Sequence, residues 1–218
     1  MFLLHLFGAF VIIYNVRMKK SQKFYLVIKR IISIFGSFIG ILFCFPLIYW
    51  WVFIINLFVT KGHTLFAQER VGKNGKTFKL LKFRSMRYGT NPNVTSAVAD
   101  RYQYTTGFGK FLRKTSLDET PQLFNVFIGQ MAFIGPRPLI DVDDDHTTNE
   151  LRKQNGSIAL TPGISGYAQT HGRIDVSPEE KAELDKYYFD HISLGLDIKI
   201  FILTLLYPFI RKRRQTDK

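Results

Sequence analysis

Cysteine and acidic residues are both scarce in this sequence. Cys44 is the only cysteine among 218 residues, which excludes an internal disulfide and suits the reducing cytoplasmic side. Aspartate and glutamate number 17 against 30 lysines and arginines, so the formal net charge is +13. Such an excess favours anionic partners, which are nucleic acids, phospholipid surfaces and phosphorylated substrates. No internal repeat or low-complexity tract is present, and the length allows one modest soluble domain with some membrane-directed sequence.

One long stretch carries no charge at all. It runs from Ile31 to Val59, and both of its flanks are basic. A membrane-crossing helix needs about 20 apolar residues, so this run is too long for an untilted crossing. Pro46 lies near its middle and would kink a helix. Because positive charge prefers the cytoplasmic side, basic residues at both ends favour a bent hairpin that re-enters the same face of the membrane. The alternative is one long, tilted transmembrane helix.

Two further apolar segments accompany this run. The segment Phe2–Val16 is short for a span and lacks a basic start and a small-residue cleavage site, so we expect an accessory membrane contact rather than a signal peptide. Residues 196–215 end in a basic cluster and are typical of a helix lying at an anionic interface. The alternative is a packed helix with a solvated basic tail. Residues 1–20 are therefore predicted as accessory, 21–60 as the membrane hairpin, and 61–218 as a cytosolic domain with a C-terminal interfacial helix.

Asn74 and Gly75 mark a turn between two extended stretches. Both residues tolerate the positive φ that a tight two-residue hairpin turn requires, so we expect a short β-hairpin here. From residue 107 to 129, apolar residues recur at helical spacing. An acidic pair and a proline interrupt that helical pattern.

The acidic pair consists of Asp118 and Glu119 within the stretch RKTSLDETPQ. Two local structures are open. Thr120 could cap a helix that starts at Pro121, or Ser116 could cap one with Glu119 as its capping-box partner. Either way the pair lies at a helix N-terminus, where the dipole favours ionised carboxylates and also attracts phosphate. Adjacent helical residues point in different directions, so we expect the two carboxylates to have different roles.

Cationic residues and a stiff turn lie before and after this pair in the sequence. Arg137 stands between Pro136 and Pro138, which fix φ, so its guanidinium would be preorganised for a bidentate anion. Arg113 lies shortly before the acidic pair. The other polar candidates for contacts with an anionic substrate are Lys82, Arg84, Gln169 and Arg173.

Five blocks of the sequence, in their order, resemble the bacterial sugar transferase family of small membrane-bound polyprenyl-phosphate phosphoglycosyltransferases. The blocks are QERVGKNGKTFKLLKFRSM, GKFLRKTSLDETPQLFNV, FIGPRPL, TPGISGYAQTHGR and DKYYFDHISLGLDIKI. The resemblance runs from about residue 29 to residue 205. It implies an α/β fold: a compact, mostly helical cytosolic domain with a short β-hairpin, carried by a Pro-kinked re-entrant membrane helix hairpin and interfacial amphipathic helices. One departure from the family pattern is that no acidic residue follows Lys29 and Arg30.

The resemblance also implies a reaction. The family moves a sugar-1-phosphate from a UDP-sugar to polyprenyl (undecaprenyl) phosphate and releases UMP. Its nucleophilic aspartate falls on Asp118, its companion glutamate on Glu119, and its two arginines on Arg113 and Arg137. Carboxylate attack on a diphosphate would split the transfer into two steps through a phospho-aspartate. Mg²⁺ is the expected metal, held by Asp118 and Glu119 together with substrate phosphates.

The same resemblance implies a place in the cell. We expect the cytoplasmic (inner) membrane, with the catalytic domain facing the cytoplasm, anionic membrane lipid as a further partner, and the first membrane step of polysaccharide or glycoconjugate assembly. The alternative function is a catalytically inactive membrane scaffold of a polysaccharide assembly complex. A nucleic-acid partner is not expected, because the chain has an uncharged membrane run and no basic motif with interleaved aromatics.

Overall fold

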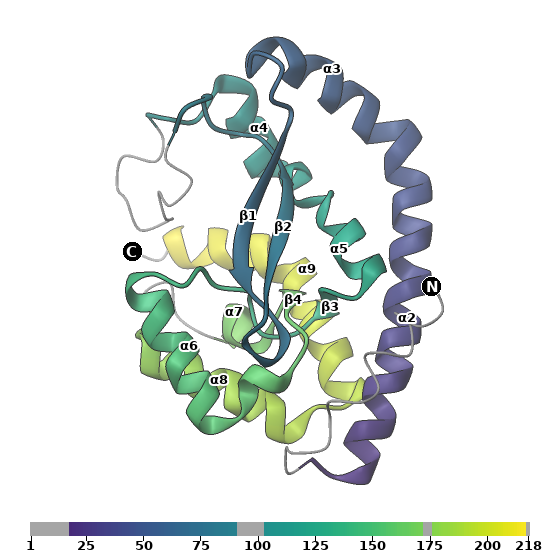
Figure 1. The fold of residues 1–218 in the computed structure, drawn as a ribbon, viewed down its shortest axis with the longest axis vertical. Helices are drawn as coiled ribbons and strands as arrows, with labels where there is room; N and C mark the ends of the chain where they lie inside the picture. Colours follow the sequence, from purple (N-terminus) through teal and green to yellow (C-terminus); the bar gives the residue numbers. More distant parts are fainter. Residues whose placement is uncertain (1–17, 91–102, 172–175, 217–218) are drawn as a thin grey trace. The chain divides into compact units, whose positions relative to one another are not determined.

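The computed structural model describes residues 18–90, 103–171 and 176–216, with side chains up to residue 206 (Figure 1). The elements are α2 (Lys20–Cys44), η2 (Phe45–Tyr49), α3 (Trp50–Val59), β1 (Leu65–Val71), η3 (Lys73–Gly75), β2 (Thr77–Phe83), α4 (Gly107–Thr115), η5 (Leu117–Glu119), α5 (Gln122–Ile128), β3 (Ala132–Ile134), α6 (Asp143–Asn155), η6 (Ser157–Ala159), β4 (Gly163–Ser165), α7 (Tyr167–His171), α8 (Pro178–His191) and α9 (Leu194–Thr216). The predicted mostly helical character with a short β-hairpin is confirmed.

The chain folds as two compact units. Of the described residues, the terminal unit comprises 18–32, 71–76, 132–171 and 176–216, and the hairpin unit comprises 33–70, 77–90 and 103–131. The predicted boundaries at residues 20 and 60 stay predictions. The N-terminal apolar segment Phe2–Val16 lies outside the described residues.

The longest apolar run forms one continuous helical path. α2, the π-helical turn η2 and α3 follow one another from Lys20 to Val59, and this path is long and apolar enough to cross a membrane. Only 11% of the most apolar 18-residue stretch of this path is buried. The π-turn contains Pro46, which lacks a backbone donor for the regular helical ladder. The predicted kink and re-entrant hairpin are not confirmed by this path, and they stay predictions.

One face of η2 and α3 packs into the hairpin unit. Tyr49, Val52 and Asn56 recur at helical spacing and are buried. The first two form a core cluster with Phe83 at the end of β2 and Leu112 of α4. The opposite face is exposed and apolar, with Phe45, Leu47, Trp50, Trp51, Phe53, Ile54 and Phe58. One face of η2 and α3 therefore packs into the protein core, and the other face presents apolar side chains to the surroundings of the protein.

The predicted β-hairpin is confirmed. β1 and β2 form a two-stranded sheet, and Asn74 and Gly75 have φ values of 57° and 76°. The turn is longer than the two-residue turn that we predicted, because the 3₁₀ turn η3 lies between the strands and the Gly72 amide donates to the Lys76 carbonyl at 2.9 Å.

Two helices pack against β2 and the residues that follow it. Asn125 of α5 accepts from the Leu81 amide at 3.0 Å and donates to the Lys79 carbonyl at 2.8 Å. α4 approaches even more closely at Gly109, where a Cβ would lie 1.9 Å from the Ser85 carbonyl oxygen. Only glycine allows this contact, so the position of α4 depends on that residue.

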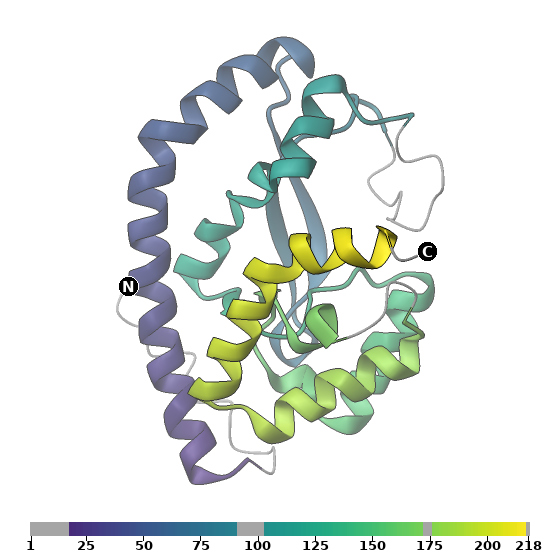
Figure 2. The same ribbon diagram turned by 180° about the vertical axis from the view of Figure 1, so that it is seen from behind.

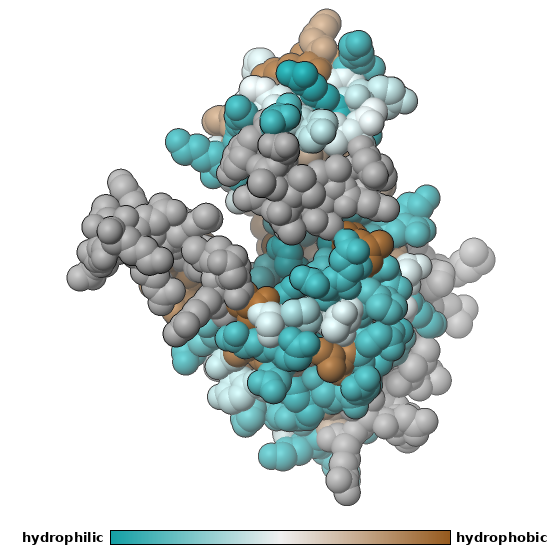
Figure 3. Space-filling model, turned by 90° about the vertical axis from the view of Figure 1, so that its left-hand side faces the viewer, coloured by the Kyte–Doolittle hydropathy of each residue, from teal (hydrophilic) through white to brown (hydrophobic). Residues whose placement is uncertain are grey.

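The terminal unit holds a second sheet, which we did not predict. Its short parallel strands β3 and β4 pair Ala132 with Gly163 and Ile134 with Ser165. α6 and α8 lie side by side in Figure 1, and a buried ion pair joins them where the Arg152 Nε donates to Asp185 at 2.8 Å. The face of this unit on the side of α6 is coloured mainly hydrophilic in Figure 3.

A buried polar cluster joins the start of α2 to α9. The Lys29 Nζ lies 2.8 Å from the Asp197 carboxylate, which also accepts from the hydroxyls of Tyr25 and Tyr188. Lys29 therefore finds its acidic partner far along the chain rather than directly after Arg30. Figure 2 shows α8 leading into α9 from the rear.

The predicted C-terminal helix is confirmed as α9, but its interfacial position stays a prediction. Ile200 is fully buried in the core, whereas the other face of the helix is apolar and exposed. The exposed side chains are Leu194, Ile198, Phe201, Ile202, Leu205 and Leu206.

Candidate active site

The acidic pair lies in a short turn of its own between two helices. α4 ends at Thr115, and Ser116 adopts the left-handed conformation with φ of 57°, which redirects the chain into the 3₁₀ turn η5. α5 then begins at Gln122, one residue after the predicted start. Ser116 stands at the N-cap position of η5, but neither η5 nor α5 has a side-chain capping hydrogen bond, so the predicted capping interactions are wrong. The Thr120 hydroxyl donates to the Leu117 carbonyl at 2.8 Å instead.

The two carboxylates of the turn have different surroundings. Asp118 is buried, with 8% of its surface exposed, whereas Glu119 is half-buried and accepts a hydrogen bond from the Lys82 Nζ at 2.7 Å. Burial raises the pKa of the Asp118 carboxyl above its ordinary value, and the nearby charge of Lys82 acts in the opposite direction. The expectation of different roles therefore has a physical basis in the structure.

Arg113 supplies a second cation beside the turn. Its Nε donates to the Ser85 hydroxyl at 2.8 Å, and its positive charge also lowers the pKa of Asp118. α4, the end of β2 and η5 thus bring Lys82, Arg113 and the acidic pair together within the hairpin unit. Cations beside a helix N-terminus are suited to binding a phosphate group, and a carboxylate held among them is suited to attacking it.

Sequence reasoning missed one residue that supports the turn. The Tyr49 hydroxyl, at the end of the π-turn η2, donates to the carbonyl of Thr120 at 2.9 Å. Its ring also contacts Phe83 at 5.4 Å and Phe124 at 6.0 Å between ring centroids. The signal was present as the helical spacing from Tyr49 to the polar Asn56 inside an otherwise apolar run.

Arg84 belongs to the same unit and lies just beyond β2. The structure gives it no contact with the acidic pair; its Nε donates instead to the His63 carbonyl at 3.0 Å. Its assignment as a substrate-binding residue stays a prediction.

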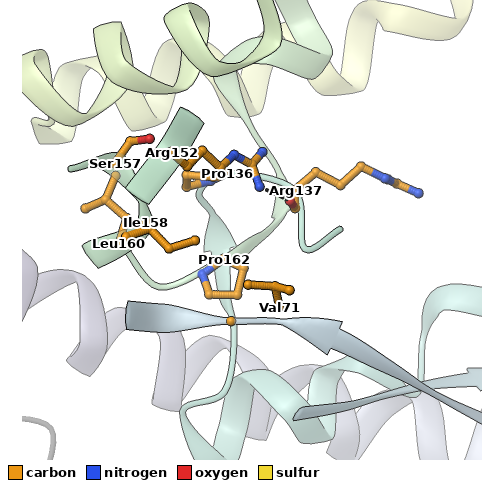
Figure 4. Close-up of a pocket in the computed structure, with 9 residues that line it drawn as sticks. Val71, Pro136, Arg137, Arg152, Ser157, Ile158, Leu160 and Pro162 are labelled. Atoms are coloured by element: carbon orange, nitrogen blue, oxygen red, sulfur yellow. Dashed lines mark hydrogen bonds between the residues drawn. The ribbon is translucent and has the colours of Figure 1, made fainter. Parts of the chain in front are cut away.

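The Pro-Arg-Pro turn belongs to the terminal unit. Pro136 and Pro138 are buried and Arg137 is exposed between them, as a preorganised turn requires. The Arg137 carbonyl accepts from Arg152 Nη1 at 3.0 Å, and Figure 4 shows the Arg137 guanidinium extending away from the other residues of the pocket that it lines. That pocket contains none of the side chains gathered around Asp118.

The remaining two predicted substrate contacts lie in or after α7. The Gln169 side chain donates to the Ile164 carbonyl at 3.3 Å, and its Oε1 is buried without a partner among the described residues. The amide therefore helps to hold α7 against β4, and its predicted contact with substrate stays a prediction. Arg173 lies outside the described residues.

The acidic pair has a donor set that fits Mg²⁺. Among the described residues, no group of three or more histidine, cysteine or acidic side chains could hold a metal ion. Mg²⁺ needs no such cage, because it binds through one or two carboxylates and completes its shell with water and substrate phosphates. Asp118 and Glu119 supply this number of carboxylates, although Lys82 already contacts one oxygen of Glu119.

The comparison with known families decides the identity of the chain. The model of the bacterial sugar transferase family matches residues 24–211. The chain belongs to the bacterial sugar transferase family. This match includes the acidic pair, both flanking arginines and the whole helical path from residue 24 onward.

Curated relatives of this bacterial sugar transferase family member come from several bacteria. A galactosyl transferase, CpsE, of Streptococcus agalactiae serotype III (strain NEM316) is 36% identical over 208 residues, covering 85% of this chain and 44% of the relative. A UDP-glucose:undecaprenyl-phosphate glucose-1-phosphate transferase of Klebsiella pneumoniae is 38% identical over 158 residues, covering 70% of this chain and 34% of the relative. An uncharacterized sugar transferase, EpsL, of Bacillus subtilis (strain 168) is 35% identical over 180 residues, covering 83% of this chain and 86% of the relative. The chain thus spans less than half of the first two relatives and most of the third.

Proposed function

We propose that this chain transfers a sugar-1-phosphate from a UDP-sugar to a polyprenyl phosphate and releases UMP. The observation that carries the proposal is the buried Asp118 beside the Glu119–Lys82 ion pair, in a chain of the bacterial sugar transferase family. The Klebsiella pneumoniae relative, named as a UDP-glucose:undecaprenyl-phosphate glucose-1-phosphate transferase, supports the substrate classes.

In the first step, an Asp118 carboxylate oxygen attacks the phosphorus that carries the sugar. The bond between this phosphorus and the bridging oxygen breaks, and UMP leaves with the electron pair. Asp118 then holds the phosphosugar as an acyl phosphate. The attacking group must be ionised, so the charges of Lys82 and Arg113 favour the reactive form of a carboxyl whose pKa is raised by burial.

In the second step, an oxygen of the polyprenyl phosphate attacks the same phosphorus. The bond to Asp118 breaks, the carboxylate is restored, and the product is a lipid diphosphate sugar. Lys82 and Arg113 would stabilise the negative charge that develops on the transferred group in both steps. Glu119, which keeps Lys82 in place through its hydrogen bond at 2.7 Å, would position this cation and share the metal site with Asp118. A bound Mg²⁺ would neutralise charge on the substrate phosphates.

The protein would act at a membrane with the acidic pair on the cytoplasmic side. The exposed apolar face of the helical path supports membrane association, and the basic residues at both of its ends support a path that re-enters. Labels at residues 23 and 73 should then both be accessible from the cytoplasm. Accessibility from opposite sides would favour the tilted transmembrane helix.

The decisive experiment is a single-turnover reaction without lipid acceptor. The full chain mixed with a UDP-sugar should release about one UMP per active site and gain the mass of one phosphosugar. Asp118→Asn keeps the shape of the side chain but removes the nucleophile, so it should abolish both signals. Glu119→Gln should slow the reaction without abolishing it.

Two results would count against this mechanism. Turnover by Asp118→Asn, or the absence of an adduct while UMP is still formed on addition of lipid, would favour direct attack by the lipid phosphate. Complete absence of UMP release with every UDP-sugar of a panel would favour the inactive scaffold.

A further inference from the structure

A second cationic position in the hairpin unit lies where the apolar helix ends. α3 ends at Val59, and the side chain of Phe58, directly before this end, is 78% exposed. Lys61 and Gly62 then turn the chain with φ values of 53° and 89°. His63 follows, and its ring stacks on Tyr88 with 3.9 Å between ring centroids. The apolar surface of the helix thus stops one short turn before a group of aromatic and basic side chains.

The guanidinium of Arg84 is held at the centre of this group. Its Cζ lies 5.4 Å from the centroid of the Phe66 ring and 5.6 Å from that of Tyr88. Its Nε donates to the carbonyl of His63 at 3.0 Å. Contacts of this kind with aromatic rings fix a guanidinium plane while leaving its edge open.

The backbone of Arg84 is fixed as well. Its amide donates to the Thr64 carbonyl at 2.9 Å, and its carbonyl accepts from the Asn56 side chain at 2.8 Å. The same Asn56 amide donates to the Thr64 carbonyl at 3.2 Å, and Asn56 is fully buried within α3. The membrane-directed helix therefore itself determines where Arg84 lies.

The terminal nitrogens of Arg84 remain open for a ligand. Among the described residues, the Nε bond to His63 is the one hydrogen bond of this side chain, and no carboxylate lies within ion-pair distance. Arginine presents these terminal donors as a planar fork that matches the oxygens of a phosphate. Tyrosine and a cation directly beyond an apolar helix are typical of the head-group level of a bilayer.

We propose that Arg84 binds the phosphate group of a membrane lipid, and in the reaction the phosphate of the polyprenyl acceptor. This inference rests on the proposed function for the identity of the acceptor. The geometry favours a lipid over a nucleotide because the site adjoins the end of the apolar helix. Lys82, which contacts Glu119 near the end of β2, is only two residues before Arg84 in the chain, so a lipid held at Arg84 would lie close to the phosphosugar on Asp118.

Binding can be tested separately from catalysis with the Asp118→Asn protein in detergent micelles. A short-chain polyprenyl phosphate and the corresponding polyprenol serve as probes, and native mass spectrometry measures the fraction of full-length chain that retains each. Charge-assisted hydrogen bonds to one phosphate should give a preference of about ten- to a hundredfold for the phosphate over the alcohol. In the background of Asp118→Asn, Arg84→Gln should bring the two probes close to parity, and Arg84→Lys should give an intermediate ratio.

Arg87→Gln is the matched control, because Arg87 is an exposed arginine three residues away that lies outside the ring contacts and side-chain hydrogen bonds described for Arg84. It should keep the full preference for the phosphate. Circular dichroism of each variant checks that the fold is kept. A preference that survives both Arg84 substitutions in folded protein would overturn the proposal.

Two further probes identify the source of the phosphate. Phosphatidylglycerol that is retained by the parent protein and lost in Arg84→Gln would extend the site to lipid phosphates in general, within the proposal. If UMP displaces the polyprenyl phosphate from the parent protein, and its own retention falls in Arg84→Gln, the site belongs to the nucleotide and the proposal is wrong. Because no probe in this series needs turnover, failure of the reaction mechanism would leave the binding result intact.

Discussion

Substituting Gly109 by alanine tests whether the close approach of α4 determines the geometry around the acidic pair. The new Cβ would lie 1.9 Å from the Ser85 carbonyl oxygen and 2.8 Å from the Ser85 Cα. Van der Waals contact needs about 3.5 Å, so α4 or the chain at Ser85 must move by roughly 1.5 Å. Overpacking typically costs about 1–3 kcal/mol, and a clash with the backbone of Ser85, which cannot move aside as a flexible side chain would, belongs at the upper end of that range.

Gly107→Ala is the control, because it lies in the same helix and a Cβ there would meet nothing within 4 Å. Its stability should be unchanged or higher by up to about 1 kcal/mol, since alanine favours helix more than glycine does. A loss of about 3 kcal/mol in Gly109→Ala corresponds to a melting temperature lower by roughly 6–12 °C for a chain of this size.

Thermal unfolding of the full chain in detergent, followed by circular dichroism, measures both variants. Activity gives a second readout, because displacement of Ser85 removes the acceptor for the Arg113 Nε and should reduce UMP release even below the melting temperature. Equal melting temperatures for the two variants would refute the reasoning, since only one of the two sites contains a clash.

Three further outcomes follow from the structure. Lys82→Met removes a charge that lowers the pKa of Asp118, so this pKa should rise further and the acidic limb of the rate of UMP release should move to higher pH; an unmoved limb would contradict the ion-pair geometry. Asp197→Asn leaves Lys29 buried without its counter-charge and should cost about 3–5 kcal/mol in denaturant unfolding, whereas Asp190→Asn, in an exposed ion pair, should cost under about 1 kcal/mol. A chelator should abolish UMP release and added Mg²⁺ should restore it; full activity in chelator would remove the metal from the proposal.

Features that depend on neighbouring residues could be predicted from the sequence. Asn74 and Gly75 adopt positive φ because their own side chains allow it, so the hairpin was predictable even though its turn is longer. The helix after the acidic pair began within one residue of its predicted start, because Pro121 can open a helix but not continue one.

Features that depend on distant partners could not be predicted. The left-handed Ser116 is stable only because α4 and η5 are both packed in place, and nothing in the side chain of serine requires that conformation. The partner of Lys29 is Asp197, and the sequence contains no rule that pairs these two residues. The partners of Asn56 were hidden in the same way, because they are the carbonyls of Thr64 and Arg84, which lie outside its helix.

The cluster of Tyr49 and Val52 with Phe83 and Leu112 has a consequence for the design of a soluble fragment. Two of the four buried members of this cluster come from the membrane-directed helix. A fragment that starts after residue 60 would lose both side chains and the hydroxyl that holds the carbonyl of Thr120. Trimming the helix to gain solubility should therefore give a fragment in which the turn of the acidic pair has lost the packing and the hydrogen bond that support it. Exchange of the detergent or lipid around the intact chain is the better route for crystallisation and screening.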